Sequence, residues 1–300
     1  MALVEELLKK RDGGRIILAE GIHMRRLLCS LLVSAAFVLP ATAATVDGLK
    51  IHSASKGQGQ QTVIFVHGWT CDSTSWAAQV PEFSRKYRVV TVDLPGHGQS
   101  DSPADGKFSM SLFARAVEAV RDEVKADKVV LVGHSMGAPV IRQYARLYPQ
   151  HVAGLVAVDG PLVMTGFGGG ARGDGPPRPQ MTGPEGLKAR ENMIRGMFTP
   201  QTPLPLQQQI LAMMLKAPEA TASGAMAAIF DPALQKDDVM PMPAFAIYAG
   251  TGNLPNADDM KKTLPNFKAT KIAGTGHFVM MENPKEFNRL LTEFLATIKF

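Results

Sequence analysis

Five short apolar runs recur along the chain. They are rich in Val, Ile and Ala and contain few polar residues, which is typical of strands buried on both faces of a parallel sheet. The runs lie at residues 62–66, 88–92, 128–132, 153–158 and 244–249. We therefore predict that these five segments form the strands of one buried, mainly parallel sheet.

Amphipathic segments separate several of these strands. Residues 109–124, 136–148 and 284–298 carry apolar side chains at every third or fourth position, which predicts helices with one buried face. The second helix must end before Pro149, because proline disrupts a helix interior. Strands that alternate with helices of this length indicate the α/β class, a mainly parallel sheet with helices on both faces.

The alternation stops between residues 161 and 243. Residues 166–186 consist largely of Gly, Pro and Arg, which predicts a loop. Three helical patterns follow, at residues 186–198, 206–215 and 220–230. We interpret residues 161–243 as a helical lid inserted between two parts of one core domain, residues 44–160 and 244–300.

The first 43 residues resemble a leader. Arg25 and Arg26 precede a mostly apolar stretch at residues 27–39, and small residues follow at 41–43. This order is typical of a secretory signal peptide, and the stretch is too short to cross a bilayer comfortably. We predict a signal peptide at residues 24–43, an upstream extension at 1–23, and a periplasmic or secreted protein without stable membrane insertion. An uncleaved membrane anchor is the alternative.

Composition narrows the possible partners. The 300 residues are 45% hydrophobic and 20% charged, with a formal net charge of +5, which is typical of a soluble globular protein. No run of Lys and Arg suited to a phosphate backbone occurs, so we do not expect nucleic acid as a partner. Beyond Cys29 in the leader only Cys71 is left, which excludes an internal disulfide in the mature chain. The oligomeric state is left open.

A nucleophile motif follows the third of the long apolar runs. Residues 133–137 read Gly-His-Ser-Met-Gly between a predicted strand and a predicted helix, the context in which G-x-S-x-G forms a tight turn. The turn presents the Ser135 hydroxyl at the carboxyl end of the sheet, near a helix N-terminus that favours developing negative charge. Ser135 is therefore the candidate nucleophile.

The serine needs a base. His277 lies in Gly274-Thr275-Gly276-His277-Phe278, a glycine-bounded loop just before the last helix. It follows Ser135 in the chain, which is the order of serine and histidine in hydrolases of the α/β class. A neighbouring imidazole that accepts the hydroxyl proton activates a serine, so we predict that His277 is the general base.

Backbone donors for an oxyanion are expected at two turns. His67-Gly68-Trp69 follows the strand at 62–66, and we assign the amide of Trp69 as one donor and that of Met136 as the other. The alternative is a plain turn in which the His67 side chain holds the loop by hydrogen bonds. Both can be true, since backbone donors act only when the loop is rigid.

These motifs together resemble the α/β-hydrolase superfamily, in the branch of lid-bearing serine esterases and lactonases. The resemblance rests on His67-Gly68-Trp69, on the loop at residues 93–101, on the turn around Ser135 and on the loop around His277. It implies a structural role for residues 93–100. A serine at the nucleophile turn also disfavours the dehalogenase and epoxide-hydrolase branches, which use aspartate.

The third member of the triad is ambiguous. In most relatives an Asp follows the strand at 244–249 in a G-x-x-D pattern, but here Asn253 occupies that position. In some relatives the acid ends the preceding strand, where this chain has Asp159. We favour Asp159, although Asp258 or Asp259 reaching back from a longer loop, or Asn253 itself, are alternatives. In the alternative interpretation, Asp159 only hydrogen-bonds the turn that follows it, and Asp258 and Asp259 only complement the dipole at a helix N-terminus.

The predicted function is hydrolysis of small, partly hydrophobic carboxylic esters through an acyl-enzyme on Ser135. We expect a pocket lined by His67, Gly68, His134, Phe167 and Phe278 under a methionine-rich lid. A lactonase, an amidase or a C–C bond hydrolase uses the same parts, and a binding or sensor protein with an impaired triad is the non-enzymatic alternative. No metal-ligand cluster or dinucleotide motif is present, so no metal or cofactor is predicted.

Overall fold

The computed structural model describes residues 44–164, 181–235 and 238–300. The predicted leader, Phe167 and most of the predicted loop at 166–186 lie outside the described residues.

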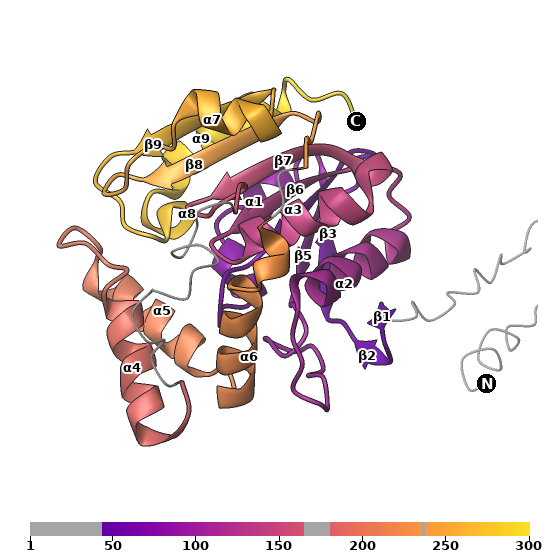
Figure 1. The fold of residues 1–300 in the computed structure, drawn as a ribbon. Helices are drawn as coiled ribbons and strands as arrows, with labels where there is room; N and C mark the ends of the chain where they lie inside the picture. Colours follow the sequence, from indigo (N-terminus) through magenta and orange to yellow (C-terminus); the bar gives the residue numbers. More distant parts are fainter. Residues whose placement is uncertain (1–43, 165–180, 236–237) are drawn as a thin grey trace, which may run out of the picture. The chain divides into compact units, whose positions relative to one another are not determined.

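One seven-stranded sheet forms the centre of the fold (Figure 1). Its order is β3-β5-β4-β6-β7-β8-β9, and every neighbouring pair is parallel except β3 with β5. The strands are β3 (Ser53–Lys56), β4 (Thr62–Val66), β5 (Arg88–Val92), β6 (Val129–His134), β7 (Val152–Val158), β8 (Ala244–Ala249) and β9 (Phe267–Ile272); β1 (Thr45–Val46) and β2 (Leu49–Lys50) pair separately. The prediction of a mainly parallel sheet is confirmed.

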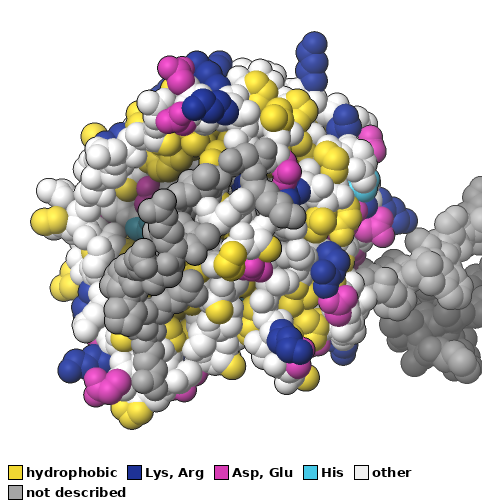
Figure 2. Space-filling view, viewed as in Figure 1, with side chains coloured by type: hydrophobic (Ala, Val, Ile, Leu, Met, Phe, Trp, Pro, Cys, Tyr) yellow, Lys and Arg dark blue, Asp and Glu magenta, His cyan; other side chains and the backbone are white. Residues whose placement is uncertain are grey.

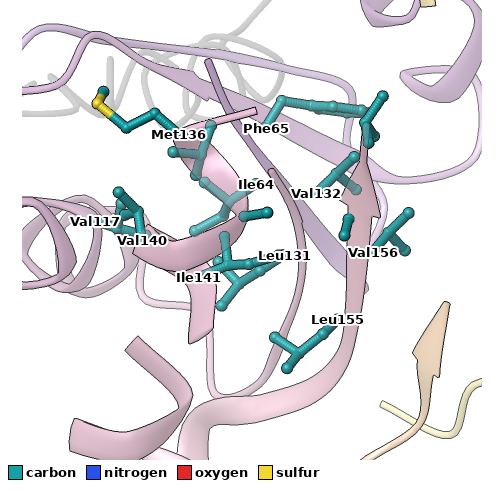
Figure 3. Close-up of a cluster of buried hydrophobic side chains, with 14 of the residues drawn as sticks. Ile64, Phe65, Val117, Leu131, Val132, Met136, Val140, Ile141, Leu155 and Val156 are labelled. Atoms are coloured by element: carbon teal, nitrogen blue, oxygen red, sulfur yellow. The ribbon is translucent and has the colours of Figure 1, made fainter. Parts of the chain in front are cut away.

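Helices cover both faces of this sheet. On one face, α2 (Met110–Glu123) and α3 (Gly137–Leu147) pack so that Val117, Val140 and Ile141 gather over Ile64 and Leu131 (Figure 3). The other face is covered by α1 (Val80–Phe83), the short helix η1 (Ser73–Trp76) and α9 (Pro284–Leu295).

An aromatic chain marks this second face. Successive strand residues point to opposite faces, so Phe65 turns away from the side of Ile64 and contacts Trp76 with ring centroids 4.9 Å apart. Trp76 in turn contacts Phe287 of α9 at 6.3 Å. The completely buried β4, β6 and β7 explain why their sequences lack the alternation of a half-exposed strand.

In the described residues, three α-helices lie in the chain between β7 and β8. They are α4 (Gly183–Arg195), α5 (Leu204–Leu215) and α6 (Glu219–Ile229), and Figure 1 shows them beyond the arrowheads of β7 and β8. The predicted loop extended too far, because residues 183–186 already form the first turn of α4. Thr182 is extended and Pro184 occupies the first turn, where its missing N–H costs nothing.

The remaining helices of the described residues are short. They are η2 (Pro149–His151), η4 (Pro232–Leu234), α7 (Ala257–Thr263), which follows β8, and α8 (Val279–Glu282), which follows β9. Within the described residues, no helix is at once long enough and apolar enough to cross a membrane.

Candidate active site

Ser135 lies in a strained turn between β6 and α3. Its φ is +52°, in the left-handed region that non-glycine residues rarely adopt. The glycines on both sides allow this turn, because neither position has room for a side chain. A Cβ on Gly133 would lie 2.3 Å from the Gly137 carbonyl oxygen, and a Cβ on Gly137 would lie 2.5 Å from the Val66 carbonyl oxygen. Ser135 is half-buried at the carboxyl end of the sheet, so its hydroxyl stands where the nucleophile motif predicts it.

Asp159 lies directly after β7 and meets His277. Its Oδ2 accepts a hydrogen bond from His277 Nδ1 at 2.6 Å, and its Oδ1 accepts one from the Ala249 amide at 2.8 Å. Asp159 also has a positive φ, +44°, and its own amide donates to the Ile247 carbonyl at 2.9 Å. Two backbone contacts with β8 therefore fix this carboxylate against the histidine.

The environment keeps this carboxylate charged. Burial alone would raise the pKa of Asp159, but the hydrogen bond from His277 and the one from the Ala249 amide outweigh it and lower the pKa below its ordinary value. A charged acceptor requires His277 Nδ1 to carry the proton. In the neutral imidazole Nε2 is then left as the proton acceptor, which is the tautomer a general base needs.

The histidine loop is held beside the nucleophile turn. His134 Nε2 donates to the His277 carbonyl at 2.9 Å, and the two imidazole rings lie 4.8 Å apart. Burial, followed by the neighbouring His277, lowers the pKa of His134 to about 3, so its ring is neutral. Among the described residues the Ser135 hydroxyl has no direct hydrogen bond to His277. Such contacts often form fully only when substrate binds.

The alternative acids lie elsewhere. Asp258 and Asp259 are exposed in the first turn of α7, where the Asn256 side chain caps the helix and Lys262 contacts Asp259 at 2.7 Å. Asn253 is exposed in the loop after β8. The structure thus places Asp159 in contact with His277, whereas Asn253 and the two aspartates of α7 have no contact with this histidine.

The His67-Gly68-Trp69 loop packs against the nucleophile turn. A Cβ on Gly68 would lie 3.1 Å from Ser135 Cβ and 2.9 Å from His134 Nδ1, so only glycine fits. Within the described part of the chain, neither the Trp69 amide nor the Met136 amide has a hydrogen-bond acceptor. These two backbone N–H groups beside Ser135 therefore make no hydrogen bond within the described fold.

His67 holds this loop, as the alternative reading of the turn proposed. Its Nε2 accepts a hydrogen bond from the Leu94 amide at 3.0 Å, so Nδ1 carries the proton that is donated to the Gly68 carbonyl at 2.8 Å. Burial lowers the pKa of His67, which keeps the ring neutral. The His67 ring therefore joins the loop after β4 to the loop after β5.

The loop after β5 is structural, as the resemblance implies. Asp93 accepts hydrogen bonds from the amides of Ser73 at 2.7 Å and Gln99 at 3.0 Å. Gly98 has φ +54°, and a Cβ there would lie 2.3 Å from the Asp93 carboxylate. This carboxylate is occupied in holding its own loop.

The predicted pocket residues that the structure describes, His67, Gly68, His134 and Phe278, are all buried. The Phe278 ring lies 5.1 Å from that of His134 and 5.5 Å from that of His277. Trp69 is buried too and donates its indole N–H to the Ala222 carbonyl of α6 at 2.8 Å. Ser135, Asp159 and His277 are partly accessible. No group of three or more potential metal ligands occurs among the described residues.

Sequence reasoning missed the contacts that hold the histidine turn. Glu282, five residues after His277, accepts hydrogen bonds from the amides on both sides of it, those of Gly276 and Phe278. The available signal was an acid at the end of a short apolar stretch directly after the predicted base. The His277 amide itself donates to the carbonyl of Met197, in the segment after α4, at 3.1 Å, and this backbone contact has no side-chain signature.

Comparison with known proteins agrees with this architecture. Residues 61–174 match the family model described as alpha/beta hydrolase fold. Among solved structures, an enol-lactonase from Burkholderia xenovorans LB400 is 17% identical with a TM-score of 0.72, covering 85% of this chain and 100% of that one. A thermophilic esterase from Thermogutta terrifontis is 24% identical with a TM-score of 0.68, covering 85% and 96%. The chain therefore has the alpha/beta hydrolase fold, and residues 61–174 bear out the resemblance that the sequence motifs predicted.

Curated relatives are similar over parts of their length. A dihydrolipoyllysine-residue acetyltransferase component of an acetoin cleaving system from Cupriavidus necator is 39% identical over 115 residues, 38% of this chain and 30% of that protein. A 2-hydroxy-6-oxononadienedioate/2-hydroxy-6-oxononatrienedioate hydrolase from Escherichia coli is 33% identical over 155 residues, 49% of each. The chain therefore spans from about a third to a half of these two relatives. Their names differ in activity, so they do not define the substrate.

Proposed function

We propose that the protein is a serine hydrolase that cleaves carboxylic esters, with Ser135 as nucleophile, His277 as base and Asp159 as the acid that orients it. The observation that carries the proposal is the 2.6 Å hydrogen bond from His277 Nδ1 to Asp159, beside a serine in a strained strand-to-helix turn. A parallel sheet needs neither feature for its own formation, and backbone strain of this kind is concentrated at functional sites.

The proposed reaction has two halves. His277 Nε2 accepts the Ser135 proton while the hydroxyl oxygen attacks the ester carbonyl, and the amides of Trp69 and Met136 bind the oxyanion. The imidazolium then protonates the leaving alcohol, and an acyl-enzyme remains. Water then attacks the acyl-enzyme with His277 again accepting and returning the proton, which releases the carboxylic acid product and restores the Ser135 hydroxyl. Asp159 stabilises the charged imidazole in both halves and does not itself take the proton.

We expect a small-molecule ester with an apolar part, because the helices inserted between β7 and β8 are rich in apolar side chains. Apolar side chains of the inserted helices, including Ile194, Met214 and Ala222, are buried in the core. Esterases and a lactonase occur among the structural neighbours, and a hydrolase of 2-hydroxy-6-oxononadienedioate and 2-hydroxy-6-oxononatrienedioate occurs among the curated relatives. Lactones, amides and C–C bonds are therefore the alternative substrates, since they use the same acyl chemistry.

Hydrolysis of p-nitrophenyl esters of graded acyl length tests the proposal. We expect turnover and fluorophosphonate labelling of the wild type, and loss of both in Ser135→Ala. Ser55→Ala, an exposed serine on β3, is the matched control and is expected to behave as wild type. A parallel series of lactones, amides and C–C substrates ranks the alternatives. A folded wild type with neither turnover nor labelling would instead support the binding or sensor protein.

We also propose that the mature protein is exported and acts on a free small molecule, without nucleic acid or stable membrane insertion. On the face seen in Figure 2, basic side chains lie beside acidic ones, with no broad basic patch. Expression from Met24 with N-terminal sequencing of the periplasmic protein tests export. A mature N-terminus at Ala44 is expected, and a cytoplasmic protein that retains residues 24–43 would overturn the export proposal.

A further inference from the structure

We propose that Glu282 is a positioning residue that holds the His277 turn and joins it to the lid through Thr202. This inference rests on the proposed function for its kinetic consequence. Its structural basis is a set of hydrogen bonds around His277 that neither the nucleophile motif nor the triad accounts for.

Three successive amides around His277 all have acceptors. The Gly276 amide donates to Glu282 Oε2 at 2.9 Å, and the Phe278 amide donates to Glu282 Oε1 at 3.2 Å. The amide of His277 itself donates to the Met197 carbonyl at 3.1 Å. One carboxylate therefore brackets the base, with one oxygen on each side, and hydrogen bonds to a charged acceptor are about twice as strong as neutral ones.

The same carboxylate contacts the inserted segment. Thr202 Oγ1 donates to Glu282 Oε2 at 2.9 Å, and the Thr199 amide donates to Thr202 Oγ1 at 2.9 Å. Thr202 is only 3% exposed, so water competes little for this contact. Residues 197–202 and the turn at 276–278 thus form one hydrogen-bonded unit, which runs from the end of α4 to the base.

Close backbone approach makes this unit specific. A Cβ on Gly276 would lie 2.6 Å from the Met197 carbonyl oxygen and 3.1 Å from Glu282 Oε1. The residue before the base must therefore be glycine for the lid to contact the turn. On its other side the turn is fixed by His134, which donates to the His277 carbonyl.

This arrangement assigns Glu282 a role in orientation. His277 must present Nε2 to Ser135 while Nδ1 stays on Asp159, and a displacement of about 1 Å can cost roughly 100-fold in rate. Glu282 restrains the backbone on both sides of the imidazole, so its loss is expected to lower kcat while leaving KM nearly unchanged. Movement of the lid segment is transmitted to the base by the Thr202 hydroxyl.

The test compares Glu282→Gln with Glu293→Gln, an exposed glutamate of α9 that pairs with Arg289. In Glu282→Gln, kcat for the best ester is expected to fall roughly 10- to 100-fold, with KM changed less than threefold. The downfield proton resonance of His277 Nδ1–H, assigned by its absence in His277→Gln, is expected to broaden or shift. Glu293→Gln should leave both readouts unchanged.

The pair Thr202→Val and Thr202→Ser isolates the lid contact. Serine keeps the hydroxyl and valine removes it, so only valine should lower kcat and perturb the His277 resonance. This pair also decides the matter if Glu282→Gln does not fold. Equal kcat and an unchanged resonance in both Thr202 variants, or in Glu282→Gln, would overturn the inference. A wild type without ester turnover would overturn the proposed function alone, because the resonance still reports on the position of His277.

Discussion

The carboxyl ends of β7 and β8 lie side by side in the sheet and differ sharply. Asp159 at the end of β7 is largely buried, has a positive φ and accepts hydrogen bonds from His277 and from the Ala249 amide. The loop after β8 carries Asn253, which is exposed and contacts no part of the triad. The resemblance places the acid of most relatives after β8, yet here the strained, enclosed position is after β7.

This difference indicates that the acid must lie within reach of the histidine Nδ1, and that no single strand has to carry it. An imidazole Nδ1 can be reached from either of two adjacent strand ends, provided that a carboxylate is held rigidly there. In this chain β8 supplies the rigidity by its backbone, through Ala249 and Ile247, while β7 supplies the carboxylate. The predictions below challenge that division of roles.

The largest expected effect is that of removing the acid. Asp159→Asn should lower kcat for an ester substrate roughly 10⁴-fold, because the amide no longer stabilises the imidazolium or its tautomer. Asn253→Ala, the matched change after β8, should leave kcat within about twofold of wild type. Steady-state kinetics on both variants check this, and a large loss in Asn253→Ala with a mild one in Asp159→Asn would reverse the assignment.

Next is a steric difference between the two strand ends. A Cβ on Gly160 would lie 2.4 Å from the Ser135 carbonyl oxygen, whereas one on Gly252 has no neighbour within 4 Å. Gly160→Ala should therefore lower the free energy of unfolding by about 1–3 kcal/mol and reduce kcat. Gly252→Ala should change stability by less than about 0.5 kcal/mol. Urea unfolding of both variants distinguishes the crowded strand end from the open one.

A smaller effect concerns pH. The pKa of Asp159 is lowered in the folded state, so its contribution to stability is full above the ordinary carboxyl pKa of 3.8 and is lost as pH falls through the folded value. The stability difference between wild type and Asp159→Asn should accordingly shrink as pH falls from about 5 towards 2. Urea unfolding at a series of pH values measures it, and a difference that grows on acidification would contradict the lowered pKa.

The smallest expected effect is that of returning an acid to the loop after β8. Asn253→Asp added to Asp159→Asn should raise kcat less than about threefold, because residue 253 is exposed and lacks the backbone donors that fix Asp159. The double variant is compared with Asp159→Asn in the same ester assay. Strong rescue would mean that this loop closes onto His277 during turnover.

Local patterns were enough to predict much of the sheet. The strands β4, β5 and β8 begin and end where the apolar runs do, since strands that are buried over most of their length leave a nearly unbroken hydrophobic signature. The predicted start of α4 is wrong because glycine and proline favour loops in a sequence pattern, although proline also suits a first helical turn.

The site was less accessible from sequence. Ser135 and His277 stand in glycine-rich turns with recognisable spacing, and the structure brings both turns together. Asp159 could only be weighed against its alternatives, because proximity to His277 depends on long-range packing of β7 against β8. Glu282 was missed entirely, because its partners are backbone amides, which carry no residue identity.

One consequence follows from the inserted helices beginning after Asp159. The proposed oxyanion loop, nucleophile and acid all precede the insertion, within residues 67–159, and the proposed base His277 alone follows it. The length and composition of the insertion can thus change without moving three of the four parts relative to one another. The segment between β7 and β8 is a natural point for exchanging modules in protein engineering, provided that the exchanged module still offers a carbonyl and a hydroxyl where Met197 and Thr202 now contact the histidine turn.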